Sequence, residues 1–127
     1  MRTFLAPARK RRLLAIVGSR CVSFSQCAAI IRREIQKRKP EAVISGGASG
    51  VDSHAAMIAG TEFDLPVIVC TPAQRTWPHF RARNTLIAEI CTELICIQSR
   101  RSATYGAEWT RDYAGNLGKP TKSWIVS

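Results

Sequence analysis

The chain has 127 residues, of which 46% are hydrophobic and 22% are charged, and its formal net charge is +10. This composition excludes an intrinsically disordered chain, and the length suits a single domain with a core of its own. Eleven of the 19 basic residues, but one of the nine acidic ones, fall within residues 1–39. The charge excess therefore lies in the first third of the chain, and such a basic segment favours a polyanionic partner.

The cysteine and histidine content argues against disulfides and metal sites. Five cysteines without a Cys-x-x-Cys pair are typical of buried, reduced thiols, and the two histidines show no ligand spacing. No signal peptide is recognisable, and no apolar run approaches the roughly 18 residues that cross a bilayer. We expect a cytoplasmic protein with no metal, no cofactor and no membrane partner.

Hydrophobic periodicity predicts strands and helices in alternation. After a basic segment, a continuous apolar run begins at Leu13, as in a buried parallel strand, and later runs repeat this pattern. The predicted strands cover residues 13–17, 42–45, 65–70, 94–97 and 124–126. We therefore expect a doubly wound, Rossmann-like α/β sandwich with a mainly parallel sheet of about five strands. It would form one domain over residues 13–127, preceded by a flexible basic arm at residues 1–12.

The intervening segments carry helical spacing of apolar residues. Gly60 is expected to end the second helix and Gly118 the last one. Residues 73–81 and 99–102 are interpreted as loops. The predicted helices cover residues 25–39, 53–59, 86–94 and 107–117, with Leu86, Leu94 and Leu117 on their buried faces.

A glycine-rich turn follows the second predicted strand. Residues 45–52 read Ser-Gly-Gly-Ala-Ser-Gly-Val-Asp and lead into a helix. Such a turn lets the backbone approach a ligand, and amides at a helix N-terminus attract anions, so phosphate is the expected guest. The spacing is neither the dinucleotide-binding Gly-x-Gly-x-x-Gly nor a P-loop. The alternative is a tight connection in which Asp52 caps the helix.

Several loops are expected at the carboxyl ends of the strands, where doubly wound sheets bind ligands. They include residues 18–20, the glycine-rich turn, residues 98–102 and the loop that carries Arg81, Arg83 and Asn84. Arginine pairs well with phosphate oxygens, although an exposed first helical turn would explain Arg83 and Asn84 equally well. Trp77 and Phe80 lie among arginines and either stack on a base or pin the loop to the core.

Basic residues in the arm, on the first helix and in these loops suggest contact with nucleic acid. A solvated helix face and a solubilising tail are the alternative interpretation. The candidate nucleic-acid-binding residues are Arg9, Lys10, Arg11, Arg12, Arg33, Lys37, Arg75, Arg81, Arg100 and Arg101.

Four segments resemble the Rossmann-like SLOG superfamily, and within it most closely the DprA/Smf DNA-processing family, with the LOG and YspA-type proteins as relatives. Residues 16–20 are similar to the family's first-strand Val-Gly-Ser-Arg, and residues 45–55 to Ser-Gly-x-Ala-x-Gly-Ile-Asp-x-x-Ala. Residues 80–88 match Phe-x-x-Arg-Asn-x-x-Ile-Ala. Gly106, Thr110, Ala114 and Gly118 fall at the spacing of the family's Gly-Ser-x-x-Thr-x-x-x-Ala-x-x-x-Gly. Ala56 and Ser49 depart from the pattern, which has histidine and a basic residue at these places.

The resemblance implies a pocket for a nucleotide or for the phosphate of single-stranded DNA. It also leaves open a LOG-like nucleoside 5'-monophosphate phosphoribohydrolase, in which an arginine and a glutamate cleave the N-glycosidic bond. Arg83 matches the arginine, whereas Tyr113 stands where the glutamate is expected, with Glu108 and Asp112 as the nearby carboxylates. The implied phosphate- or nucleotide-binding residues are Gly18, Ser19, Arg20, Ser45, Gly46, Gly47, Gly50, Asp52, Arg83 and Asn84.

The remaining expectations concern assembly and a third functional class. A sensor that binds a nucleotide messenger without turnover fits the same pocket. We expect single-stranded DNA or a nucleotide as the partner, and a homo-oligomer, most simply a dimer. Trp109 and Tyr113 on the last predicted helix provide either a further stacking surface or a dimer face.

Overall fold

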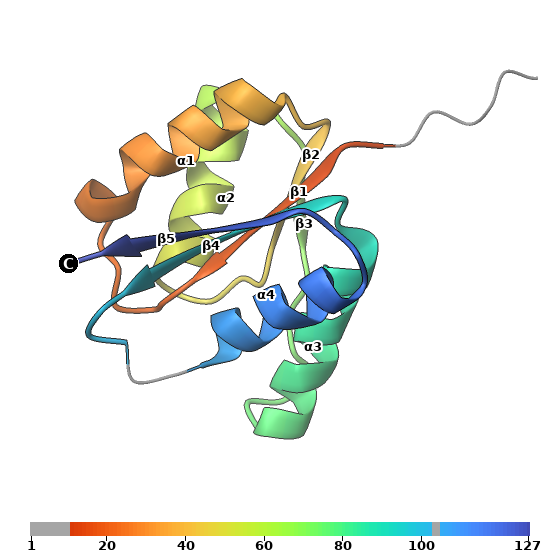
Figure 1. The fold of residues 1–127 in the computed structure, drawn as a ribbon. Coiled ribbons are helices and arrows are strands. Elements are labelled where there is room, and N and C mark those ends of the chain that lie inside the picture. The colour runs from red at the N-terminus through yellow and green to blue at the C-terminus, as the bar shows by residue number, and fades with distance from the viewer. Residues whose placement is uncertain (1–10, 103–104) are drawn as a thin grey trace, which may run out of the picture.

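The computed structural model describes residues 11–102 and 105–127, which alternate between strands and helices (Figure 1). Residues 1–10 of the predicted arm lie outside the described residues. The elements are β1 (Leu13–Gly18), α1 (Phe24–Arg38), β2 (Ala42–Ser45), α2 (Val51–Glu62), β3 (Val67–Val69), α3 (Trp77–Ile90), β4 (Glu93–Ser99), α4 (Gly106–Asn116) and β5 (Thr121–Val126).

The five strands form one parallel sheet in the order β3-β2-β1-β4-β5. The chain moves outward from β1 through β2 to β3, then crosses back to β4 beside β1. Because crossovers between parallel strands keep one hand, this reversal places α1 and α2 on one face and α3 and α4 on the other (Figure 1). The predicted doubly wound α/β sandwich is confirmed.

Each face of the sheet has its own apolar core. On one side, Ile31 and Ile35 of α1 and Ile58 of α2 pack against alternate strand residues; on the other, Ile87 of α3 and Ala114 of α4 do so. Strands β1, β2 and β4 are buried on both sides, which is why their sequences read as continuous apolar runs rather than alternating ones.

Several predicted boundaries are wrong. Helix α2 continues through Gly60 to Glu62, and α3 begins at Trp77 inside the predicted loop, with a proline in its first turn where the missing amide is tolerated. Strand β4 contains Leu94 and extends to Ser99. Leu86 and Leu117, predicted on buried faces, are each 47% exposed.

All five cysteines are free thiols. Cys21 is exposed, whereas Cys27, Cys70, Cys91 and Cys96 are buried, and burial raises the pKa of the Cys96 thiol to about 12. Within residues 11–102 and 105–127, no group of three or more His, Cys, Asp or Glu side chains is placed to hold a metal ion. None of the helices in these ranges is long and apolar enough to cross a membrane.

Candidate functional site

The turns after β1 and β2 are packed against each other at the carboxyl edge of the sheet. Gly50 has φ +78°, and a Cβ there would lie 2.4 Å from the Ser19 carbonyl oxygen; a Cβ on Gly18 would lie 2.1 Å from the Ile97 carbonyl oxygen. The Val51 amide donates to the Ser19 carbonyl oxygen at 3.3 Å. A Cβ on Gly18 would also lie 2.6 Å from Val51 Cγ2, at the end of the turn after β2. Glycine is therefore required at both positions for the close packing of the two turns.

Ser19 and Ser45, the two serines predicted to bind phosphate, instead hold these turns in place. The Ser45 hydroxyl donates to the Asp52 carbonyl oxygen at 2.9 Å and accepts from the Gly47 amide at 3.2 Å, while the Ser19 hydroxyl oxygen accepts from the Ser99 amide at 3.2 Å. Both serines are buried. Their hydroxyls fix the loops internally rather than face the surface.

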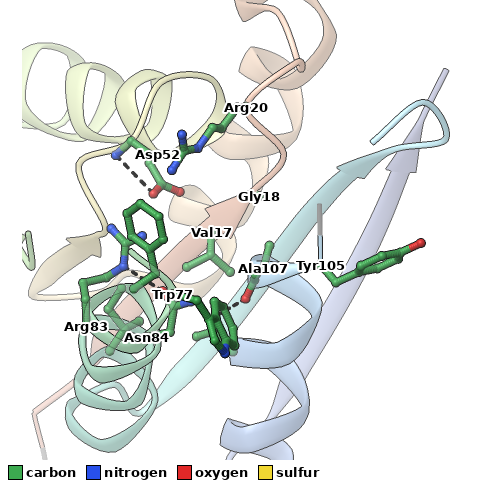
Figure 2. Close-up of a pocket in the computed structure, with 14 residues that line it drawn as sticks. Val17, Gly18, Arg20, Asp52, Trp77, Arg83, Asn84, Tyr105 and Ala107 are labelled. Carbon is green, nitrogen blue, oxygen red and sulfur yellow. Dashed lines mark hydrogen bonds between the residues drawn. The ribbon is translucent and has the colours of Figure 1, made fainter. Parts of the chain in front are cut away.

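A pocket of about 280 Å³ lies beside these turns, between β1, α3 and α4. Figure 2 shows Asp52 and Arg20 on one side of it, Arg83 and Asn84 projecting from α3, and the Trp77 indole between α3 and α4. Tyr105 is at the rim with its ring pointing outward (Figure 2). Tyr105 is not among the site residues predicted from the sequence, although its place just before Gly106 at the start of α4 was a usable signal.

A second hollow of about 390 Å³ adjoins the first. Gly46, Gly47, Ser49, Thr71 and Arg75 line it, and it shares four residues with the first pocket: Arg20, Ala48, Phe80 and Arg83. The guanidinium carbons of Arg20 and Arg83 lie 5.5 and 5.7 Å from the Phe80 ring centroid. An aromatic ring with two cations over it thus forms the wall between the two hollows.

Arg83 is anchored on both sides of this wall. It donates to the Gly46 carbonyl oxygen, and its Nε donates to Asn84 Oδ1 at 2.7 Å. Burial lowers its pKa from the ordinary value, an effect that Asp52 opposes. A Cβ on Gly46 would lie 2.6 Å from Asp52 Oδ2 and 2.7 Å from Arg83 Nη1, so glycine at this position leaves room for both side chains.

Asp52 is the carboxylate of the pocket and is only 6% exposed. Its Oδ2 accepts from the Ala48 amide at 3.4 Å, whereas its buried Oδ1 has no hydrogen-bond partner within residues 11–102 and 105–127. Burial raises the pKa of Asp52 to about 6, against the opposing influence of Arg83 and of the nearby Ala48 and Gly18 amides. A buried, unsatisfied acceptor of this kind calls for a donor.

The other predicted carboxylates lie elsewhere. Glu108 Oε1 accepts from Gln98 Nε2 at 2.7 Å, and Asp112 is 2.9 Å from Arg111 with 66% of its side chain exposed. Neither lines either hollow. A hydrolase would require Glu108 or Asp112 in the pocket beside Arg83. The structure places Arg83 in the pocket without either carboxylate.

Most of the predicted nucleic-acid-binding residues that the structure describes lie at one of two opposite edges of the sheet. Arg11, Arg12 and Lys37 precede β1 or β2 and lie at the amino edge, where Arg12 donates to the Lys39 carbonyl oxygen and lies 3.7 Å from Glu41. Arg33 is exposed on α1, on the opposite face from α3. Arg9 and Lys10 lie outside the described residues. The exposed basic residues at the carboxyl edge are Arg20, Arg75, Arg81, Arg100 and Arg101.

Trp109 and Tyr113 contact each other and α3. Their rings stack with centroids 5.3 Å apart, and Trp109 meets Trp77 edge-on at 6.0 Å. This aromatic cluster joins α4 to α3 within one chain, and its Trp77 lines the pocket. The predicted dimer stays a prediction.

A parallel sheet in this order, with a pocket at the carboxyl ends of its strands, defines a Rossmann-like α/β protein. A family model described as DNA recombination-mediator protein A matches residues 5–78, more than half of the chain. The chain belongs to this DprA family, as its motifs suggested.

One similar solved structure is DNA processing protein A (DprA) from Streptococcus pneumoniae. The TM-score is 0.73 at 22% sequence identity, and the match covers 89% of this chain and 50% of that one. The likeness shows a shared fold, and the chain spans about half the length of that structure. A comparison with the curated proteins found no match.

Proposed function

We propose that the protein binds single-stranded DNA at the carboxyl edge of its sheet, with a backbone phosphate in the hollow formed by Arg20, Arg75 and Arg83. The observation that carries this proposal is the convergence of three guanidiniums on one hollow. Among the described residues, no salt bridge joins Arg20 or Arg75 to a carboxylate. Their charge is therefore available to a phosphate.

The arginines, rather than the glycine-rich turn, supply the main phosphate contacts in this proposal. Three amides of the turn, those of Gly47, Ala48 and Val51, already donate to Ser45, Asp52 and Ser19. The turn instead shapes the hollow by keeping side-chain bulk out of it. This differs from a P-loop, in which backbone amides surround the phosphate.

We expect a preference for a single strand because its bases are unpaired. Phe80 and Trp77 lie beside the phosphate hollow, and base–aromatic stacking requires a base that is not already paired within a duplex. Membership of the DNA recombination-mediator family supports DNA as the polyanion. A cytoplasmic location belongs to the same proposal.

We test this function with a labelled 20-nucleotide single strand and fluorescence anisotropy at low and moderate salt. Arg20→Gln and Arg75→Gln should each weaken binding roughly tenfold, because each removes one charge-assisted phosphate contact. Each should also reduce the slope of log K against log salt by about 0.7. Arg33→Gln is the matched control, since it removes an exposed arginine from α1 on the other face of the sheet.

Two outcomes would contradict the proposal. Equal weakening by Arg33→Gln would indicate diffuse attraction to a basic surface rather than a site at the carboxyl edge. Release of free base from an added nucleoside monophosphate, measured by chromatography, would favour the phosphoribohydrolase alternative. We expect no release, because Glu108 and Asp112 lie outside the pocket.

A further inference from the structure

We propose that DNA binding is linked to a proton: Asp52 becomes protonated when a DNA phosphate occupies the hollow lined by Arg20, Arg75 and Arg83. The protein then binds single strands more tightly as the pH falls. This inference rests on the proposed binding of single-stranded DNA and adds a means of regulating the same site. It concerns the charge of a buried carboxylate beside the phosphate hollow rather than a contact to the DNA.

Asp52 lies next to the glycine-rich wall of the phosphate hollow. Gly46 lines that hollow, and a Cβ on Gly46 would lie 2.6 Å from Asp52 Oδ2 and 2.7 Å from Arg83 Nη1. The carboxylate itself lines the neighbouring pocket, where Figure 2 shows it beside Arg20. A phosphate in the hollow would therefore bring a second negative charge close to a buried carboxylate.

The negative charge of Asp52 has little direct support. In the described part of the chain, its buried Oδ1 has no hydrogen-bond partner, and its Oδ2 accepts one long bond of 3.4 Å from the Ala48 amide. No salt bridge among the described residues joins Asp52 to a cation. The charge depends instead on attraction over a longer distance by Arg83 and Arg20 and on the nearby Ala48 and Gly18 amides.

The titratable groups that interact with Asp52 come from three other parts of the fold. Arg83 of α3 and Arg20 of the turn after β1 attract its negative charge. Cys96 of β4 also interacts with it, but burial raises the pKa of that thiol to about 12, so the thiol stays neutral. On the side of α4, the pocket is lined by Tyr105, whose ring points outward (Figure 2). Burial raises the pKa of Asp52 itself to about 6, which brings its protonation close to neutral pH.

A bound phosphate would claim the two arginines on which Asp52 depends. Arg20 and Arg83 line the hollow, and a phosphate paired with them offsets the positive charge that keeps Asp52 ionised. The phosphate also repels the carboxylate directly. Both effects raise the pKa of Asp52 in the complex, so the complex binds a proton more tightly than the free protein. Because such linkage is reciprocal, protonation of Asp52 strengthens DNA binding by the same factor.

The experiment uses a strand of 20 thymidines with a rhodamine label, because its bases and phosphodiesters do not titrate between pH 5.5 and pH 8. We expect the wild-type protein to bind it about five- to tenfold more tightly at pH 5.5 than at pH 8 by fluorescence anisotropy at one ionic strength. This ratio corresponds to a pKa of Asp52 about one unit higher in the complex. Asp52→Asn should bind the strand at pH 8 about as tightly as the wild type does at pH 5.5, and its ratio should be within about twofold.

Three matched variants separate Asp52 from other charges. Asp112→Asn removes an exposed carboxylate outside both hollows and should keep the pH dependence of the wild type. Histidine side chains in general gain charge over the same pH range. His54→Gln in α2 and His79→Gln in α3 alter residues that line neither hollow, so they should keep the pH dependence as well. Loss of the pH dependence in either histidine variant would overturn the inference.

Calorimetry of the wild-type protein provides a test that does not require Asp52→Asn to fold. Titrations of the thymidine strand at pH 6.5 in two buffers of different ionisation enthalpy measure the protons taken up, and we expect about half a proton per complex. No uptake, equal affinities at the two pH values, or an unchanged ratio in folded Asp52→Asn would overturn the inference and leave the proposed function intact. Failure of the wild type to bind the strand at low salt at either pH would overturn both.

Discussion

Alanine at Gly50 is expected to lower the free energy of unfolding by about 3–5 kcal/mol, through backbone strain and a steric clash together. The residue has φ +78° and ψ −134°, a region open almost only to glycine. A Cβ would also lie 2.4 Å from the Ser19 carbonyl oxygen and 2.6 Å from Arg20 Cα. These atoms belong to the backbone of the neighbouring turn, which cannot yield without moving Arg20 away from the site.

Urea unfolding followed by circular dichroism measures this loss. Gly60→Ala is the control, because Gly60 lies inside the same helix, α2, and a Cβ there would meet nothing within 4 Å. That substitution should stabilise the protein by about 0.5–1 kcal/mol, the usual gain in a helix interior. Similar unfolding energies for the two variants would show that the turns after β1 and β2 are not locked together.

Asparagine at Asp52 is expected to stabilise the protein at pH 7.5 by up to about 3 kcal/mol. The folded protein holds the pKa of this carboxyl at about 6, above the ordinary 3.8, because burial disfavours the charged form. The folded state therefore binds the proton more tightly than the unfolded state. The stability contributed by Asp52 is greatest below about pH 4 and is lost as the pH rises through 6.

Thermal and urea unfolding of both proteins at pH 7.5 and pH 4 provide the measurement. The advantage of Asp52→Asn should be large at pH 7.5 and close to zero at pH 4. Glu34, which forms ion pairs with Arg38 and Lys122, also titrates in this range. Its effect cancels in the difference between the unfolding free energies of the variant and the wild type. A variant that is less stable than wild type by the same amount at both pH values would contradict a raised pKa for Asp52.

The pattern of the sequence determined the architecture. Continuous apolar runs such as residues 13–17 and 42–45 indicated strands buried on both faces, and helical spacing between them implied crossovers, so the parallel doubly wound sheet followed. The family motifs likewise marked residues 16–20 and 45–55. These features are local, and each can be recognised within one element and its neighbours.

Element ends and buried faces depended on tertiary contacts. Gly60 does not end α2, because packing of the helix on the sheet holds a glycine that propensity alone disfavours. The segment that begins at Trp77 resembles a loop in composition, yet it forms the first turns of α3. Leu86 is exposed because the side of α3 that meets the sheet is the one carrying Ile87.

The chemistry of the site was decided only by the tertiary structure. Ser19 and Ser45 looked like phosphate ligands, but neighbouring strands and turns use their hydroxyls, since burial leaves them no other partners. The sequence singled out Asp52 and Arg83, whereas the burial that raises one pKa and lowers the other comes from segments far apart in the chain. The separation of the basic residues onto two edges has the same origin, because the direction of each strand assigns its flanking residues to one end of the sheet.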